Sequence, residues 1–253
     1  MLTSYLAATR GLLQNPSAPT SLYSTTDLTT YINSARGQLA GEAECCRFMA
    51  SLAVSAAGGY IYPFTATNLT GSAGVQGILA VRMAWYQVGS GQRLIRLRSF
   101  EWFGHYELNN PVPDSGPPRV WAQYGQGAEA QSVPNPVGGG SIYLSPIPDA
   151  NYTLRLDTVC YPVPLTDDST PEAIPYLWTD AVPYYAAYLA LLGAQTGART
   201  AEADKMFERY QMFVARARGA STPSVMPGSF PQAPSLVRAN QLGAAPQSGG
   251  RTQ

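Results

Sequence analysis

The hydrophobic pattern changes its period near residue 58, and this change constrains the fold more than any other feature of the chain. Before it, apolar side chains recur every three or four residues, as on one face of an α-helix, at Leu28, Tyr31, Ile32, Ala35, Leu39, Ala43, Cys46, Met49 and Ala53. After Gly58-Gly59 the apolar residues alternate with a period of two, which indicates β-strands. The chain is therefore predicted to join a helical N-terminal part to a β-rich middle.

Two helices are predicted before the change of period. The first covers residues 2–14 and is stopped by the Asn15-Pro16 pair. The second begins at Ser24-Thr25-Thr26-Asp27, which resembles a capping box because a hydroxyl can cap the first turn and a carboxylate follows three residues later. This helix is predicted to continue until the two glycines end the pattern, so that Cys45 and Cys46 lie on it.

Five strands are predicted in the middle of the chain, over residues 78–86, 93–99, 120–124, 141–144 and 152–161. The first two flank Gly89-Ser90-Gly91 and are predicted to form a hairpin. Leu79, Val81, Met83 and Trp85 are assigned to one face of the first strand. The segments 109–118 and 125–140 are rich in glycine and proline, which favours exposed loops.

Helical periodicity returns after residue 164. Pro171 and Pro175 suit a first helical turn, so a helix is predicted from there through Leu192, with a kink at Pro183. Its apolar centre is shorter than a membrane span requires. A second helix covers residues 200–218 with apolar side chains on one side, and the two are predicted to pack as an antiparallel pair.

The predicted fold class is α+β: a discontinuous helical bundle from both chain ends, with an inserted antiparallel β domain and an extended C-terminal tail. The predicted domains are 1–57 and 165–218 for the two halves of the bundle, 58–164 for the β domain and 219–253 for the tail. The tail has five prolines and five glycines and cannot build its own core. It is either a disordered end without a role or a segment that becomes ordered on a partner through Phe230, Leu236 and Val237.

The composition offers little for catalysis. The only histidine is His105 and the only lysine is Lys205, which excludes an HExxH metal site and a phosphate-binding GxxxxGK[ST] loop. The three cysteines show no CxxC spacing and are predicted to be reduced and structural, so neither a metal nor a cofactor is expected. Sixteen basic residues balance sixteen acidic ones, so no overall charge attracts nucleic acid or a membrane surface.

The remaining enzymatic signals are weak, and no catalytic residues are assigned. They are a GxGxxA match at residues 125–130 that is soon followed by prolines, His105 with Glu101 or Glu107, the pair Asp167-Asp168, and Glu42 with Glu44. His105 lies among aromatic residues and is predicted to be a packed structural residue. An alternative to a structural role is a glycan- or receptor-binding β module that uses Trp85, Trp102 and Trp121, and a hydrolase is a weaker alternative.

Three segments of the chain resemble head-to-tail adaptor (connector) proteins of tailed bacteriophages. They are Leu22-Tyr23-Ser24-Thr25-Thr26-Asp27-Leu28 with Tyr31-Ile32-Asn33 and Ala35-Arg36, then Leu144-Ser145-Pro146-Ile147-Pro148-Asp149 before the strand at 152–157, and finally Tyr184-Tyr185-Ala186-Ala187-Tyr188. The resemblance covers residues 1–57 and 141–218, and the shared order of the motifs supports it more than any single motif does.

The resemblance implies a structural protein of the virion, assembled in the host cytoplasm and placed at the head-tail junction. Such a protein docks as a ring, usually of twelve copies, beneath the portal protein and forms the platform and DNA channel for the tail proteins. DNA passes without sequence-specific binding, and no membrane is involved. In such families the C-terminal segment commonly reaches into the portal, so the resemblance implies portal-binding residues in the tail, with Phe230, Leu236, Val237 and Arg238 as the candidates.

Overall fold

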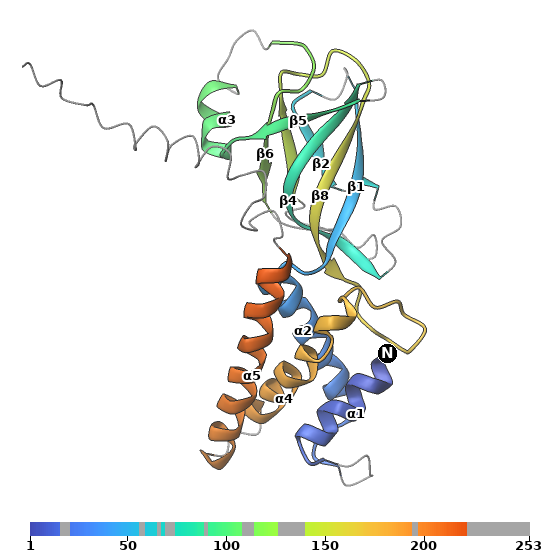
Figure 1. Ribbon diagram of the computed structural model, residues 1–253, viewed down its shortest axis with the longest axis vertical. Coiled ribbons are helices and arrows are strands. Elements are labelled where there is room, and N and C mark those ends of the chain that lie inside the picture. Colours follow the sequence, from blue (N-terminus) through green and yellow to red (C-terminus); the bar gives the residue numbers. More distant parts are fainter. Residues whose placement is uncertain are drawn as a thin grey trace, which may run out of the picture.

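The computed structural model describes residues 1–15, 21–55, 59–64, 67–68, 74–88, 91–107, 114–125, 140–193 and 197–221. Four helices gather at one end of the molecule and the strands gather at the other (Figure 1). The mixed α+β class predicted from the sequence is confirmed. The predicted tail starts too early, since α5 continues to Ser221, and residues 222–253 lie outside the described residues.

The four helices come from both ends of the chain. They are α1 (Leu2–Leu12), α2 (Thr25–Ala43), α4 (Ala181–Gly193) and α5 (Gly197–Ser221), and α4 contacts each of the other three. The predicted cap of α2 is confirmed, because the Asp27 N–H donates to Ser24 Oγ at 3.0 Å and this hydroxyl donates to Asp27 Oδ2 at 2.7 Å. α4 and α5 pack as neighbours and run in opposite directions (Figure 1).

The second helix is much shorter than predicted, because α2 ends at Ala43 and strand β1 (Arg47–Val54) follows. Glu44 adopts a left-handed conformation with φ of 51°, which breaks the helix. Cys45 and Cys46 therefore lie between the helix and the strand. Every residue of β1 pairs with β8 (Tyr152–Pro162), from Arg47 opposite Val159 to Val54 opposite Tyr152. This long-range pairing overrides a local pattern that also fits a helix.

The strands form one sheet in the order β2-β7-β6-β5-β4-β8-β1-β3. The other members are β2 (Ile61–Pro63), β3 (Thr67–Asn68), β4 (Val75–Val88), β5 (Gly91–Leu97), β6 (Val120–Tyr124) and β7 (Ser141–Ser145). The five predicted strands and the hairpin of β4 and β5 are confirmed. The prediction of an antiparallel β domain is wrong for one pair of strands, since β5 and β6 pair in parallel.

Register shifts in β4 change which side chains face the core. The pairing with β8 is interrupted between Ile78 and Ala80 and again between Val81 and Met83. Each irregularity moves the following residues to the other face. The buried residues are therefore Ile78, Val81, Ala84 and Tyr86, whereas Met83 is 41% exposed, and the predicted face of Leu79, Val81, Met83 and Trp85 is wrong.

The amide side chain of Gln123 in β6 compensates for the irregular part of β4. Its Oε1 accepts the Val81 N–H at 2.8 Å, and its Nε2 donates to the Leu79 carbonyl at 3.1 Å. Backbone groups that the register shifts remove from the ladder are thereby satisfied, as buried backbone groups require.

A helix that the sequence analysis did not predict, α3 (Phe100–Tyr106), covers one side of the sheet. Ser99 caps it, since its Oγ accepts the Trp102 N–H at 3.3 Å. The fully buried Phe103 and the Phe100 ring pack toward Tyr143 of β7, with ring centroids 6.1 and 5.0 Å away. The serine before an acidic first turn is the signal that could have predicted it.

The helix predicted from Pro171 and Pro175 begins later than expected, whereas the last helix, predicted from residue 200, begins earlier, at Gly197. Pro171 and Pro175 lie in the connection after β8, a short 3-10 turn covers Tyr176–Trp178, and α4 starts only at Ala181. Pro183 therefore stands in the first turn of α4, where an N–H has no intrahelical partner, so the predicted kink has no cause. In the described parts of the chain, no helix is long and apolar enough to span a membrane.

Two hydrophobic clusters meet at the boundary between the helices and the sheet. One is built from α1, α2, α4, α5 and the connection after β8, and the other from the inner face of the sheet. Phe48 of β1 packs against both clusters. The residues of β1, which the sequence pattern assigned to a helix, therefore join the helices to the sheet.

Candidate functional site

The segments that carry the adaptor resemblance lie at structural junctions. In the first, the Asn33 side chain of α2 binds the backbone of Leu165: its Oδ1 accepts the N–H at 2.8 Å and its Nδ2 donates to the carbonyl at 3.0 Å. The Asn33 amide therefore satisfies both backbone groups of Leu165, in the connection between β8 and α4, as a neighbouring strand would do. It fixes where the chain leaves the sheet and returns to the helices.

Arg36, one turn after Asn33, forms a buried ion pair with Glu172. The arginine side chain is fully buried, its Nη2 lies 2.8 Å from Glu172 Oε1, and its Nε donates to both carboxylate oxygens at 3.2 and 3.1 Å. Its Nη1 donates to the Val163 carbonyl at 2.7 Å. A buried guanidinium needs such a set of partners, because an uncompensated buried charge is strongly unfavourable.

The same connection also holds the start of α1. Asp168 Oδ1 accepts from the ammonium group of Met1 at 2.6 Å and from the Thr3 N–H at 2.8 Å. The hydrogen bonds from the ammonium group and from Thr3 hold the pKa of Asp168 well below its usual range. The carboxylate thus acts as an N-terminal cap from a distant part of the sequence, where the helix dipole favours a negative charge.

The second and third segments are also structural. Ser145-Pro146 is a cis peptide bond at the end of β7, and Asp149 accepts from the Tyr152 hydroxyl at 2.6 Å, which raises the pKa of Tyr152 to about 12. The tyrosines of α4 join it to α5. Tyr184 stacks on Phe213 with centroids 5.8 Å apart, and Tyr185 lies 4.6 Å from Tyr210.

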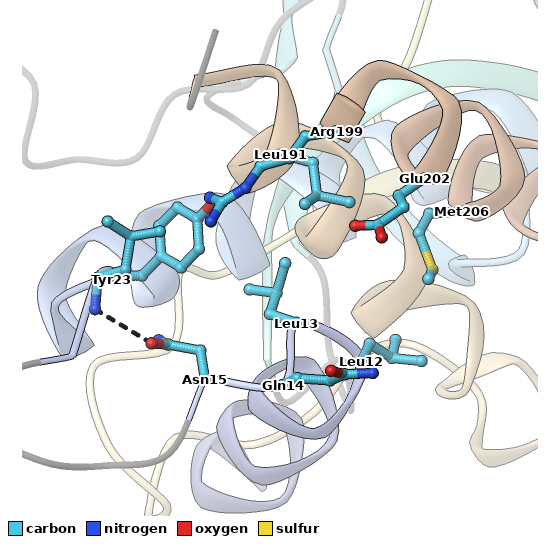
Figure 2. Close-up of a pocket in the computed structure, with 10 residues that line it drawn as sticks. Leu12, Leu13, Gln14, Asn15, Tyr23, Leu191, Arg199, Glu202 and Met206 are labelled. Atoms are coloured by element: carbon cyan, nitrogen blue, oxygen red, sulfur yellow. Dashed lines mark hydrogen bonds between the residues drawn. The ribbon is translucent and has the colours of Figure 1, made fainter. Parts of the chain in front are cut away.

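The first segment also reaches a pocket at the helix ends remote from the sheet. The pocket has a volume of about 630 Å³ and lies between the end of α1, the residues before α2, the end of α4 and the first turns of α5. Figure 2 shows the lining residues, which are Leu12, Leu13, Gln14, Asn15, Leu22, Tyr23, Leu191, Arg199, Glu202 and Met206. Arg199 Nη1 donates to the Tyr23 hydroxyl at 3.2 Å, so one wall is held by a bond between α5 and the segment before α2.

The chemistry of this pocket fits a binding surface better than an active site. Its walls are leucine, methionine, tyrosine and the two amides of Gln14 and Asn15, with Arg199 and Glu202 as the charged groups. The lining residues include no cysteine, serine, lysine or histidine, so a nucleophile next to a base is missing from the described lining. Asn15 is buried and accepts the Leu22 N–H through its Oδ1 at 3.1 Å, which shapes the rim (Figure 2).

The structure separates the weak enzymatic candidates from one another. His105 is exposed on α3, so the prediction of a packed histidine is wrong; Phe103, on the opposite side of the helix, takes the buried position. Asp167 binds its own turn at Ser169 and Thr170, whereas Asp168 binds α1. Most of the GxGxxA match, residues 126–130, lies outside the described residues.

The pair of Glu42 and Glu44 is not a solvated helical face. Glu42 accepts from the Tyr210 hydroxyl at 2.9 Å, and Glu44 lies beyond the helix end and forms an ion pair with Arg82 of β4. Both carboxylates therefore join α2 to other elements. In the described part of the chain, no three metal-ligating side chains come together.

The tryptophans offer little to a sugar. Trp121 is 1% exposed and belongs to the core of the sheet, and Trp85 is half-buried. Trp102 is half-buried, stacks on Tyr106 at 5.4 Å and carries the Arg98 guanidinium 5.4 Å from its ring centroid. The predicted portal-binding residues Phe230, Leu236, Val237 and Arg238 lie outside the described residues.

Comparison with known proteins gives one family. A protein-family model described as SU10 adaptor protein matches residues 2–227, a range that includes every described helix and strand and all three segments discussed above. No curated protein matches the chain.

Proposed function

Because the chain belongs to the SU10 adaptor protein family, a family of bacteriophage structural adaptors, we propose that it docks as a ring beneath the portal protein. There it forms the platform and the DNA channel for the tail proteins, at the head-tail junction of the virion. The observation that carries this proposal is the family match over residues 2–227. We propose twelve copies in the ring.

The platform in this proposal is one bundle made from both chain ends, with the β domain looped out between them. The contacts of α4 with α1, α2 and α5 support it, as does the buried pair of Arg36 and Glu172. The sheet is continuous with the bundle through β1 and α2, so a load on one part is transmitted to the other. A connector between two large assemblies requires such coupling.

The C-terminal segment is the proposed portal-binding arm, and its starting point is well held. Arg47 Nη1 donates to the Ser221 carbonyl at 2.6 Å, and Ser221 Oγ donates to the Ala43 carbonyl at 2.7 Å. Arg47 also forms an ion pair with Asp157 of β8. The arm therefore begins where the helices meet the sheet, and residues 222–253 have ~105 Å of reach when extended.

The anchors proposed for the arm are Phe230, Leu236, Val237 and Arg238. They are an aromatic side chain, two aliphatic ones and a guanidinium in a segment that otherwise has few large apolar residues, which is the composition of a peptide that orders on its partner. All four lie beyond residues 2–227, the range matched by the family model, so their composition, and not the match, supports this part of the proposal.

The proposed channel agrees with the charge of the chain. Sixteen basic and sixteen acidic residues give a formal net charge of zero, and strong phosphate contacts would hold DNA back through counterion release. DNA therefore passes through the proposed ring without sequence-specific binding.

The test uses purified portal rings and sedimentation or single-particle mass measurement. The full chain is expected to add about a dozen copies to each portal ring. A chain that ends at Ser221 keeps the contacts with Ala43 and Arg47 and is expected to fold but to lose portal binding. The full-length triple variant Phe230→Ala, Leu236→Ala, Val237→Ala is expected to behave like the truncated chain.

Matched substitutions in the same segment, Gln232→Ala, Asn240→Ala and Gln241→Ala, are the control and are expected to leave binding unchanged. Undiminished binding of the truncated chain would remove the arm from the proposal while leaving the docking intact. A failure of the full chain to associate with portal rings would contradict the docking itself.

A further inference from the structure

A second groove of the protein lies on the sheet, away from the pocket of Figure 2, and arginine dominates it. It has a volume of about 510 Å³ and is lined by Tyr86, Arg93, Leu94, Arg96, Arg98, Pro117, Pro118, Arg119 and Val120. Four of these residues are arginine and none is acidic. In a chain whose formal net charge is zero, this is a local concentration of positive charge.

Backbone hydrogen bonds bring the arginines together. The Arg96 N–H donates to the Arg119 carbonyl at 2.9 Å, and the Arg98 N–H donates to the Trp121 carbonyl at 2.8 Å, so Arg119 lies beside Arg96. All four arginine side chains are exposed. Among the described residues, Arg93, Arg96 and Arg119 form no ion pair with a carboxylate, unlike Arg36, Arg47 and Arg82.

The strand β5, which carries Arg93 and Arg96 and is followed directly by Arg98, has an open edge. β5 pairs with β6 only at Arg96 and Leu97, so within the described chain its first half, residues 91–95, pairs with β4 alone. On the other side of the groove, Pro117 and Pro118 have no N–H to donate. An extended peptide can add to such an edge as a further strand through its backbone.

We propose that this groove binds an extended acidic peptide of a partner protein. In an extended peptide, side chains two residues apart lie on one face about 7 Å from each other. Arg96 of β5 and Arg98, directly after the strand, have the same separation in sequence, and the Arg98 N–H continues the contact with β6. Leu94, which is 56% exposed, continues the same face and offers an apolar contact next to the charges. The peptide that matches Leu94, Arg96 and Arg98 has one apolar side chain followed by two carboxylates, each two residues apart.

Two other occupants fit the groove less well. The phosphates of DNA match the arginines, but the sugar-phosphate backbone has no projecting apolar side group to pack on the surface made by Leu94, Pro117 and Val120. The chain's own residues 222–253 contain two arginines and no acidic residue, so they would be repelled. The proposal does not depend on portal docking, because the groove lies on the sheet and the proposed arm starts at Ser221.

The test is fluorescence anisotropy with the full chain and a labelled peptide that repeats Leu-Ser-Glu-Ser-Glu twice. We expect binding that is weakened at least about tenfold in the double variant Arg96→Glu, Arg119→Glu. The matched control Arg209→Glu, Arg216→Glu reverses two exposed arginines on α5 and is expected to bind as the native chain does. Leu94→Asp keeps all arginines and is a second test of the same groove, expected to weaken binding too.

Three outcomes of the binding measurements on the native chain and the double variants would overturn the proposal. They are absence of peptide binding to the native chain, equal weakening in the groove variant and in the α5 variant, and tighter binding of a short DNA duplex than of the peptide. The peptide in which lysine replaces glutamate is expected not to bind. If the double variant fails to fold, Leu94→Asp decides the question, and its undiminished binding of the peptide would contradict the proposed site.

Discussion

The Arg36 guanidinium and the Glu172 carboxylate lie 2.8 Å apart at their closest atoms, across 136 residues of sequence, with the arginine fully buried. The pair joins α2 to the connection that leads from β8 to α4. Glu172 Oε1 also accepts the Ile174 N–H at 2.9 Å, so the carboxylate fixes its own loop as well. Both halves of the helical region meet at this contact.

Removal of one partner of this pair is expected to be strongly destabilising. Arg36→Met leaves the Glu172 carboxylate without its cation, and Glu172→Gln leaves a buried guanidinium, so each should lower the free energy of unfolding by about 3–5 kcal/mol. Urea denaturation followed by circular dichroism measures the change. The double variant Arg36→Met, Glu172→Met is expected to lose less than the sum of the two single variants, and additive losses would show that the residues do not act as a pair.

The contact of Asp168 with α1 is expected to make stability depend on pH in the acid range. Its folded pKa is lowered, so the stability it contributes is fully present above the unfolded pKa of about 3.9 and is lost as the pH falls through the folded pKa. Asp168→Asn should therefore be less stable than the native chain at neutral pH, and the difference should shrink below about pH 4.

Thermal unfolding from neutral to acid pH tests this dependence. Asp204→Asn, at an exposed position of α5, is the control and is expected to leave the pH profile unchanged. A difference between Asp168→Asn and the native chain that is independent of pH would contradict the assigned role of the carboxylate.

The register shifts of β4 predict that truncation of Ile78 destabilises the protein much more than truncation of Met83. Ile78 is 2% exposed and Met83 is 41% exposed, although simple alternation places Met83 on the same face as the buried Val81 and Ile78 on the other. Ile78→Ala is expected to lower the free energy of unfolding by about 2–5 kcal/mol, and Met83→Ala by less than about 1 kcal/mol. Equal losses in chemical denaturation would be inconsistent with the shifted register.

Cys160 is expected to resist alkylation in the folded protein. Its side chain is fully buried, and burial raises the pKa of its thiol to about 11, so the reactive thiolate is scarce at pH 8. Iodoacetamide followed by peptide mass mapping should find it unmodified in native protein and modified in urea. Rapid modification in native protein would show that the strand pairing of β8 opens.

The sequence by itself determined the elements whose signals are local. The cap at Ser24, the five strands from residue 78 onward and the last helix follow from side-chain periods and turn residues within a few positions of each other. The adaptor family could also be predicted from the sequence, because the segments around Tyr23, Asn33 and Tyr185 resemble that family, and a match over residues 2–227 shows it. Portal binding by the residues after 221 remains a prediction.

Only the tertiary structure decided what long-range pairing controls. Residues 47–54 fit both periods, and they form a strand because β8 pairs with all of them. The face of β4 depends on register shifts that Gln123 stabilises from another strand. Arg36 looks like any helical arginine until Glu172 is placed beside it, and the arginine groove exists because parallel pairing brings Arg119 next to Arg96. Such contacts join residues that are far apart in sequence, so no local pattern encodes them.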